Sequence, residues 1–286
     1  MLLRAQQAPA RPSFEITSVK VNKSADQAYF NFPLGPGDVY SSNGGRFSAR
    51  GLPLTSYLFF AYKNTGDQSQ AVLSQLPGWA STDRFDIEAK TDGDPAKDTK
   101  DQMRLMMQSL LAERFGLVAR YETRQVPIFA LTLARPGKTG PQLRAHPDDE
   151  PCSRALQSAG GPAPDATVAG GFPALCGGFL GMLPGMPGRI RLRARNVTIE
   201  FIGQHLIANF LNRPVIDRTG LSGSFDVVME WTPEANGPGA GGDVQPDPTG
   251  PTFLEALSEQ QGLKAESQKG PAEVLVIDHV DHPSEN

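Results

Sequence analysis

The chain has 286 residues, a formal net charge of -4 at pH 7 and 39% hydrophobic residues. This length suits one large domain or two medium domains, and the near-neutral charge argues against a nucleic-acid partner. No apolar run approaches the length of a bilayer-spanning helix, so we expect no membrane span.

Residues 1–13 are rich in alanine and proline after a short apolar start. The stretch "RAQQA" is typical of the region around a signal-peptide cleavage site. We therefore interpret these residues as the remnant of a leader and expect a periplasmic or secreted protein. The alternative is an ordinary disordered start.

The hydrophobic pattern predicts two blocks, 14–136 and 189–286, with the same order of elements. In the first block these are a strand (46–54), a helix (54–64), a strand (84–90), a helix (99–116) and a hairpin (117–135). In the second block they are strand 191–199, helix 198–211, strand 224–231, helix 251–262 and hairpin 263–280. We expect an α+β fold made by tandem duplication of a strand–helix–strand–helix–strand–strand unit, with small mixed or antiparallel sheets and helices on one face.

Helix ends can also be predicted. Thr198 suits the N-cap of the helix that follows it, and Thr55 is an alternative N-cap in the first block. Gly116 and Gly262 suit the C-caps of the second helix in each block. From these glycines the two blocks align without a gap through Leu131 in the first and Ile277 in the second.

Glycine and proline dominate residues 137–188, which predicts a connection without regular structure between the blocks. Cys152 and Cys176 lie in this connection. In an exported protein we expect them to form a disulfide that closes the loop, the alternative being two free thiols. Residues 232–251 have a similar composition and predict a mobile loop.

The pair Phe-Asp begins one predicted strand in each block, at Asp86 and at Asp226. Alternation along a strand points both carboxylates away from the apolar face. Aspartates in this position commonly accept hydrogen bonds from nearby backbone N–H groups. The alternative is catalysis by a pair of carboxylates, as in glycosidases, drawn from Asp83, Asp86, Asp226 and Glu230.

Other catalytic candidates are few. His205 lies in an apolar helical stretch and could join Ser222 and Asp217 in a hydrolase triad, although no nucleophile-elbow motif surrounds Ser222. His279 and His282 belong to "DHVDH", which in an extended chain offers at most two ligands on one side. A closed metal site needs about four, so we predict no metal and no other cofactor and keep His279 as a catalytic candidate.

Two features suit ligand binding. The stretch "RIRLRAR" (189–195) places its arginines on one strand face, which suits an anionic ligand or a solvated surface. They are Arg189, Arg191, Arg193 and Arg195. The only tryptophans, Trp79 and Trp231, flank the two Phe-Asp strands and suit either stacking on a ligand or burial at the edge of the core.

Several phrases together resemble a known family. They include "FEITSVKVNKS" (14–24), "GGRFSARGLPLTSYLFFAY" (44–62), "LPGWASTDRFDIEAK" (76–90) and "RPVIDRTGLSGSFDVVMEWTP" (213–233). In these the chain resembles the soil-associated, Solibacter-type family of exported bacterial proteins of unknown function. The resemblance implies export and supplies no catalytic residue. Each half also resembles, in fold alone, the short N-terminal domains of secretins and TonB-dependent receptors, which bind partners.

The sequence therefore predicts an exported binding or interaction module, whose partner is an unknown protein, small molecule or glycan. It favours a non-enzymatic role because no convergent catalytic set is visible. Two alternatives stay open. One is an extracellular hydrolase acting on an ester, glycan or peptide, and the other is a cell-envelope assembly component.

Overall fold

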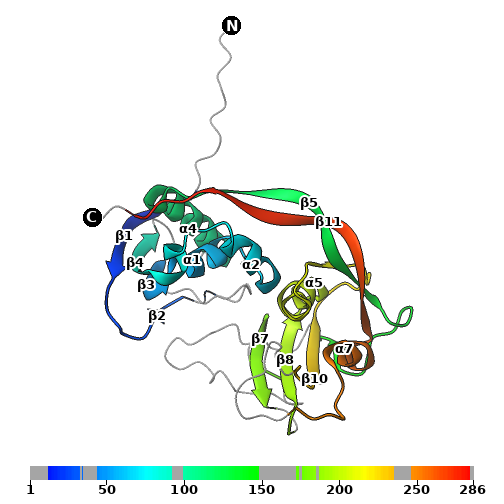
Figure 1. Cartoon of the computed structure of the whole chain (residues 1–286). Coiled ribbons are helices and arrows are strands. Elements are labelled where there is room, and N and C mark those ends of the chain that lie inside the picture. The colour runs from blue at the N-terminus through cyan, green and yellow to red at the C-terminus, as the bar shows by residue number, and fades with distance from the viewer. Residues whose placement is uncertain are drawn as a thin grey trace.

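The computed structural model describes residues 12–32, 34, 44–91, 99–147, 172–173, 176–184, 187–234 and 246–283. These residues form two lobes under a long two-stranded ribbon (Figure 1). Each lobe combines a small antiparallel sheet with helices, so the predicted α+β class is confirmed. None of the described helices is both long enough and apolar enough to span a bilayer.

The first lobe is built on an antiparallel sheet with helices packed against it. Its described strands, in spatial order, are β1 (Phe14–Asn22), β4 (Arg84–Thr91), β3 (Arg46–Pro53) and β2 (Tyr29–Phe30). Its helices are α1 (Leu54–Ala61), α2 (Gly66–Leu73), α3 (Trp79–Thr82) and α4 (Lys100–Phe115). Alternation along β4 buries Phe85, Ile87 and Ala89, as the sequence pattern predicts, and they join the apolar core of this lobe.

The second lobe repeats this plan. Its described strands, in spatial order, are β6 (Leu143–Ala145), β10 (Phe225–Trp231), β8 (Ile190–Val197) and β7 (Gly178–Pro184). Its helical segments are α5 (Ile199–Ile202), the π-helical turn η2 (Gly203–Ile207), α6 (Ala208–Leu211) and α7 (Phe253–Gln261). Phe225, Val227 and Met229 are buried along β10, again as predicted.

Two strands come from the segment predicted as an irregular connection, 137–188. They are β6 and β7, which form the two edges of the second sheet in the described part of the chain. β6 has only three residues, and β7 consists of apolar residues, glycine and proline, so neither shows the alternation of apolar and polar residues that predicts a half-buried strand. Residues 148–171 of this connection and residues 235–245 of the predicted mobile loop lie outside the described residues, as do residues 1–11.

The ribbon corrects one prediction. The predicted hairpins over 117–135 and 263–280 do not form, because each segment is one unbroken strand, β5 (Val118–Leu133) or β11 (Leu263–His279). These two strands pair with each other along their length in antiparallel register. No local pattern in the sequence predicts this pairing of distant segments.

Each ribbon strand contains a proline that does not interrupt it. Pro127 and Pro271 lie inside the strands rather than in turns. Backbone groups of Glu273, Leu275 and Ile277 face out of the ribbon, since they bind side chains of the first lobe. Backbone direction alternates along a strand, so the missing N–H of Pro271 also faces outward and removes no bond between β5 and β11.

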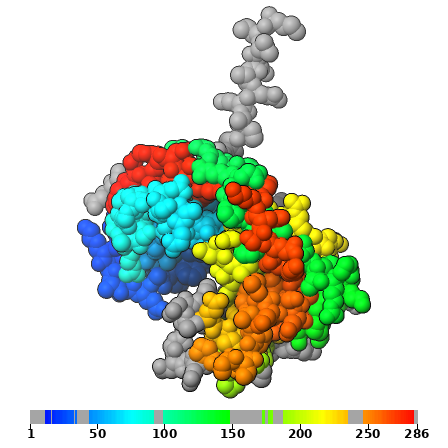
Figure 2. Space-filling view, turned by 45° about the vertical axis from the view of Figure 1, so that its right-hand side comes forward, coloured from blue at the N-terminus to red at the C-terminus, as the bar shows by residue number. Residues whose placement is uncertain are grey.

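Each ribbon strand completes the core of the other half of the chain. Leu131 from β5 is fully buried in the second lobe, and Leu275 from β11 is buried in the first lobe. A short strand, β9 (Val215–Asp217), adds to β5 in parallel within the second lobe. Figure 2 shows the ribbon running across both lobes. The two lobes therefore share strands and are not independent along the chain.

The helices α4 and α7 have the same kinds of N-cap and C-cap. Both α4 and α7 begin with a capping box, formed by Thr99 with Gln102 and by Thr252 with Glu255. They end at Gly116 and Gly262, whose φ angles of 58° and 68° confirm the predicted left-handed C-caps. Thr198 caps α5 as predicted, whereas α1 begins directly after Pro53 and contains Thr55.

The ribbon is centred on equivalent positions of the two blocks. The offset in sequence between Gly116 and Gly262 equals the offset between Gln125 and Pro271, and these last two residues face each other across the ribbon. This relation agrees with the predicted duplication of one unit. The duplication itself and the domain boundaries stay predictions.

Replacing Leu275 with alanine should destabilise both lobes together. The side chain is 1% exposed, and a leucine-to-alanine change in a core costs about 2–5 kcal/mol. Denaturation can be followed by Trp79 alone in a Trp231→Phe background and by Trp231 alone in a Trp79→Phe background. We expect both midpoints to fall and to coincide, because the lobes share the ribbon.

The control for this experiment is Val118→Ala, on a side chain that is 52% exposed in β5. It should change the free energy of unfolding by only about 0.5 kcal/mol. A shift of the Trp79 midpoint without a shift of the Trp231 midpoint would contradict shared stability.

Candidate functional site

The two Phe-Asp aspartates hold the backbone of a neighbouring strand. Asp86 Oδ1 accepts hydrogen bonds from the N–H of Gly51 (2.8 Å) and from the side-chain amide of Asn22 (2.7 Å). Asp226 Oδ1 accepts one from the N–H of Asn196 (3.0 Å). Gly51 and Asn196 have positive φ angles, 67° and 53°, at matching register shifts of β3 and β8. Both aspartates thus bind the backbone of a β-bulge, and they lie in different lobes.

Asp226 also contacts a histidine that the sequence analysis missed. His146 Nδ1 lies 2.8 Å from Asp226 Oδ1, and the two side chains are 3% and 9% exposed. His146 directly follows β6, inside the predicted connection. No motif marks this residue, and the pairing of β6 with β10 brings it to Asp226.

Part of the predicted arginine strip is engaged in ion pairs. Nε and Nη2 of Arg191 each lie 2.7 Å from Oε2 of Glu230. Arg189 binds Asp247 at 2.9 Å. Glu230 is 13% exposed at its side chain and therefore lies in a largely buried ion pair rather than in an open catalytic position.

The prediction that the arginines of 189–195 all lie on one exposed strand face is wrong for the last of them, Arg195. Arg193 is half-buried, but Arg195 is only 2% exposed, because the bulge at Asn196 turns the strand. Ligand binding by Arg191, Arg193 and Arg195 stays a prediction.

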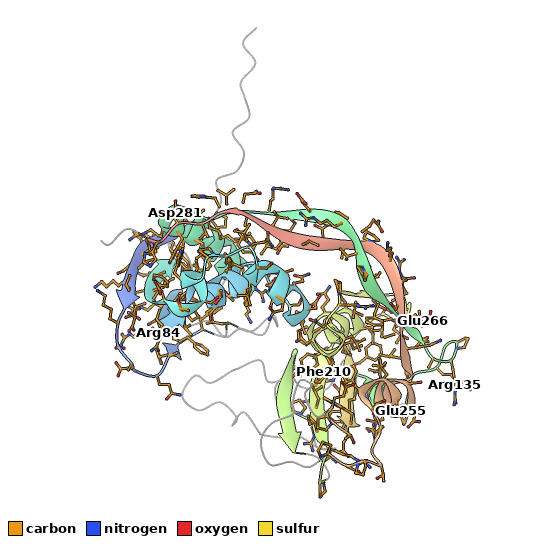
Figure 3. The ribbon with its side chains drawn as sticks, viewed as in Figure 1. Arg84, Arg135, Phe210, Glu255, Glu266 and Asp281 are labelled. Atoms are coloured by element: carbon orange, nitrogen blue, oxygen red, sulfur yellow. The ribbon has the colours of Figure 1, made fainter. Side chains whose placement is uncertain are left out.

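The two tryptophans occupy different surroundings. Trp231 is 1% exposed and packs edge-on against the rings of Phe210 and Phe253, so it belongs to the second core. Figure 3 labels Phe210 within this lobe. Trp79 is half-buried, and its ring lies 4.9 Å from that of His282. The two predicted alternatives for the tryptophans are stacking on a ligand and burial at the edge of the core. The burial of Trp231 fits the second alternative.

The residues of the predicted triad have other contacts. Asp217 Oδ1 accepts hydrogen bonds from the N–H and the hydroxyl of Thr219, both at 2.8 Å, and closes a local turn. Ser222 is exposed, and the half-buried ring of His205 packs against Phe201 at 4.6 Å. The triad stays a prediction.

The two C-terminal histidines each contact one carboxylate. His279 Nε2 lies 2.8 Å from Asp281 Oδ2, and His282 Nε2 lies 3.0 Å from Asp83 Oδ2. Asp281 lies over the first lobe near the end of the ribbon (Figure 3). Within the described ranges, no three His, Cys, Asp or Glu side chains are grouped to hold a metal ion.

Cys176 is 3% exposed and lies two positions before the first residue of β7. Cys152 lies outside the described residues. The disulfide between Cys152 and Cys176 therefore stays a prediction.

A cleft of about 300 Å³ opens where the two lobes meet the ribbon. The first lobe lines it with the residues between α1 and α2 and with the first turn of α2. The second lobe contributes η2, α6 and β9, and the ribbon contributes both of its strands. Tyr62, Asp67, Tyr121, Gln204 and Glu273 are among its lining residues. Among the described residues, none of those predicted from the sequence to form a site lines this cleft.

A second hollow of about 560 Å³ lies on the first lobe alone. Lys23, Asp26 and Arg50 are among its lining residues, and Asp86 lies at its wall. Small-molecule sites are usually apolar and aromatic with a few polar groups. The inter-lobe cleft, which includes tyrosine, proline, valine and isoleucine, fits this description better.

Side-chain hydrogen bonds fix the walls of the cleft. Asn209 Oδ1 in the second lobe accepts a hydrogen bond from the N–H of Gly66 at the start of α2 (2.7 Å). Gln75, just after α2, donates to the carbonyl of Leu275 (3.2 Å) and accepts from the N–H of Ile277 (3.0 Å). These bonds tie α2 to both the second lobe and the ribbon.

Among the described residues that line the cleft, the charged groups are the carboxylates of Asp67 and Glu273 and the amine of Lys63. Lys63 Nζ lies 2.8 Å from Asp101 Oδ1, which lowers the pKa of Asp101. Neither Asp67 nor Glu273 forms an ion pair with any residue that the structure describes. Burial raises the pKa of Asp67, although the Thr65 hydroxyl and nearby backbone N–H groups offset part of the effect.

Tyr62 and Tyr121 join the first lobe to the ribbon beside these carboxylates. The Tyr121 hydroxyl donates to the carbonyl of Tyr62 (2.6 Å), and the two rings pack edge to face at 6.2 Å. Burial, followed by the charges of Tyr62 and Glu273, raises the pKa of Tyr121 to about 12. Tyr121 is therefore a hydrogen-bond donor at neutral pH.

Residues 55–280 match a family described as protein of unknown function (DUF3738). This range includes every residue that lines the inter-lobe cleft. No curated protein matches the chain, and no solved structure does.

Replacing Asp226 with alanine should destabilise the fold by about 1–3 kcal/mol, because it removes a buried acceptor that His146 and the Asn196 N–H share. Asp86→Ala should cost about 1 kcal/mol, since Asp86 is only half-buried. Urea denaturation measures both changes.

Asp83→Ala is the control, because Asp83 pairs with His282 at the surface and should change stability by about 0.5 kcal/mol or less. Equal free energies of unfolding for Asp226→Ala and Asp83→Ala would contradict the role of Asp226 in holding the bulge.

Proposed function

Since the chain belongs to the DUF3738 family of proteins of unknown function, we propose a function from its geometry: an exported binding module that holds a small ligand in the inter-lobe cleft. The predicted membership of a family of unknown function is confirmed by this match. Its soil origin and the likeness of each half to secretin and TonB-receptor domains stay predictions.

One observation carries the proposal. The cleft forms where three separate parts of the fold meet, and ligand sites occur preferentially at such junctions. Its walls are held in place by hydrogen bonds between α2, the second lobe and the ribbon. A site with fixed walls loses less conformational entropy when it binds a ligand.

The contacts of the predicted catalytic residues support binding rather than turnover. Asp86 and Asp226 bind the backbone of two bulges, and Glu230 lies in an ion pair with Arg191. Each of these carboxylates already has a structural task. The hydrolase and the envelope-assembly alternatives have no specific observation in their favour.

The exported part of the proposal rests on the sequence. The predicted disulfide between Cys152 and Cys176 suits an oxidising compartment. The burial of Cys176 is compatible with that pairing, because disulfide sulfurs are usually shielded from solvent.

A thermal-shift screen with cationic, neutral and anionic small molecules tests the proposal. A ligand that binds the folded state raises the melting temperature, by the equivalent of about 2.7 kcal/mol at a hundred times its Kd. The variant Gln204→Trp should fill the cleft, because Gln204 is an exposed lining residue on η2. We expect compounds that stabilise the wild type and fail to stabilise Gln204→Trp.

The matched control is Glu259→Trp, which adds the same side chain at an exposed position of α7 outside the cleft. It should respond to the same compounds as the wild type. A screen in which every stabilising compound also stabilises Gln204→Trp, or in which none stabilises the wild type, would overturn the proposal. If the protein chemically converts a stabilising compound, the protein is an enzyme and the proposal of a binding module is wrong.

A further inference from the structure

We infer that the inter-lobe cleft selects small organic cations and binds an alkylammonium group through Asp67, Glu273 and two tyrosine rings. This inference rests on the proposed function and names the chemical class of its ligand.

The charge of the cleft favours a cation. Asp67 and Glu273 come from different parts of the fold. Asp67 lies at the start of α2 in the first lobe, and Glu273 lies on β11 of the ribbon. Neither carboxylate has an ion-pair partner in the part of the chain that the structure describes. Lys63, the basic residue of the lining, already binds Asp101. A positively charged ligand would therefore meet two carboxylates that no described side chain neutralises.

The hydrogen bonding of Asp67 is incomplete. Its Oδ1 atom is buried and accepts no hydrogen bond from any described group. A buried acceptor without a donor is unfavourable, more so when it is charged. The raised pKa of Asp67 has the same cause, since burial penalises its ionised form. An ammonium group in the cleft would supply the opposite charge and so favour the ionised form of Asp67.

Glu273 is held by the ribbon. Its side chain accepts a hydrogen bond from the hydroxyl of Thr123, which faces it across the ribbon. Its backbone carbonyl accepts one from the amide of Gln68, which also lines the cleft. The carboxylate is therefore positioned without being neutralised.

The aromatic residues and the volume of the cleft further define the chemical class of the ligand. Aromatic faces attract ammonium groups, and Tyr62 and Tyr121 line the same cleft as the carboxylates. The volume of about 300 Å³ is at the lower end of the range for small-molecule sites. It suits one ammonium-bearing group, either a free amine or a single basic side chain of a peptide.

Calorimetric titration of the full chain tests this class with two matched pairs of probes. The first pair is choline and its neutral analogue 3,3-dimethyl-1-butanol. The second pair is N-acetyl-lysine methylamide and N-acetyl-norleucine methylamide. We expect at least one cation to bind about tenfold more tightly than its neutral partner, as for a charge-assisted contact. Binding of choline identifies a free ammonium compound, and binding of only the lysine derivative identifies a peptide side chain.

Two variants connect the affinity to the named groups. Asp67→Asn and Glu273→Gln keep the shape of each side chain and remove its charge, and each should weaken the cation about tenfold. The control is Glu266→Gln, which makes the same charge change on the same strand, where Glu266 pairs with Lys264 at the surface (Figure 3). Glu266→Gln should bind the cation like the wild type. Because Glu273 is exposed, its variant keeps the test valid if Asp67→Asn does not fold.

The outcomes separate this inference from the proposed function. Equal affinity for a cation and its neutral partner, or unchanged affinity in both Asp67→Asn and Glu273→Gln, overturns the inference. If a neutral or anionic compound binds and Gln204→Trp blocks it, the cleft is a ligand site of another class. If no compound is blocked by Gln204→Trp, both the inference and the proposed function are wrong.

Discussion

The structure depends on the pairing of β5 with β11. These are the longest strands described, and each begins within two residues of a left-handed glycine that ends a helix, Gly116 or Gly262. Each strand runs unbroken from its own lobe into the other, so neither folds back as a hairpin. They pair with each other instead and insert Leu131 and Leu275 into the opposite cores. Burying a leucine in this way contributes roughly 1.5–3 kcal/mol per residue to the shared stability.

The ribbon also creates the cleft. It holds two similar lobes at a fixed spacing, and the lobes differ on the side where they face each other. The first lobe presents α2 there, and the second presents β9 and the π-helical turn η2. Asn209 and Gln75 bind backbone groups across this junction, so the space between the lobes keeps defined walls. The ligand site we propose is therefore a product of how two similar units are joined.

Local features of the fold could be predicted from the sequence. The alternation in the Phe-Asp strands, the two glycine C-caps and the N-cap at Thr198 depend on neighbouring residues alone. These predictions are confirmed because no contact with a distant part of the chain overrides the local preference. The hydrogen bonds of Asp86 and Asp226 to backbone N–H groups follow the same rule, although the bulges that supply these groups were not foreseen.

The candidate site could not be predicted, for a physical reason. Tyr121 and Glu273 are far apart in the sequence and become neighbours only through the ribbon, whose prolines resemble turn signals. No local pattern shows that these prolines face outward. Asp67 has no motif around it, and its unusual state comes from burial at a junction of lobes. The His146–Asp226 contact was missed for the same reason, since an edge strand with little pattern carries His146 to β10.

The most direct test of this account is disulfide trapping across the ribbon. Thr123 and Glu273 face each other, with an expected Cα separation of about 4.5–5.5 Å, which suits a disulfide. The double variant Thr123→Cys, Glu273→Cys should form this bond under mild oxidation, as shown by mass spectrometry of the linked peptides. The out-of-register pair Thr123→Cys, Lys269→Cys should not. Failure of the first pair to link, or equal linking of the second, would contradict the exchange of strands between the two lobes.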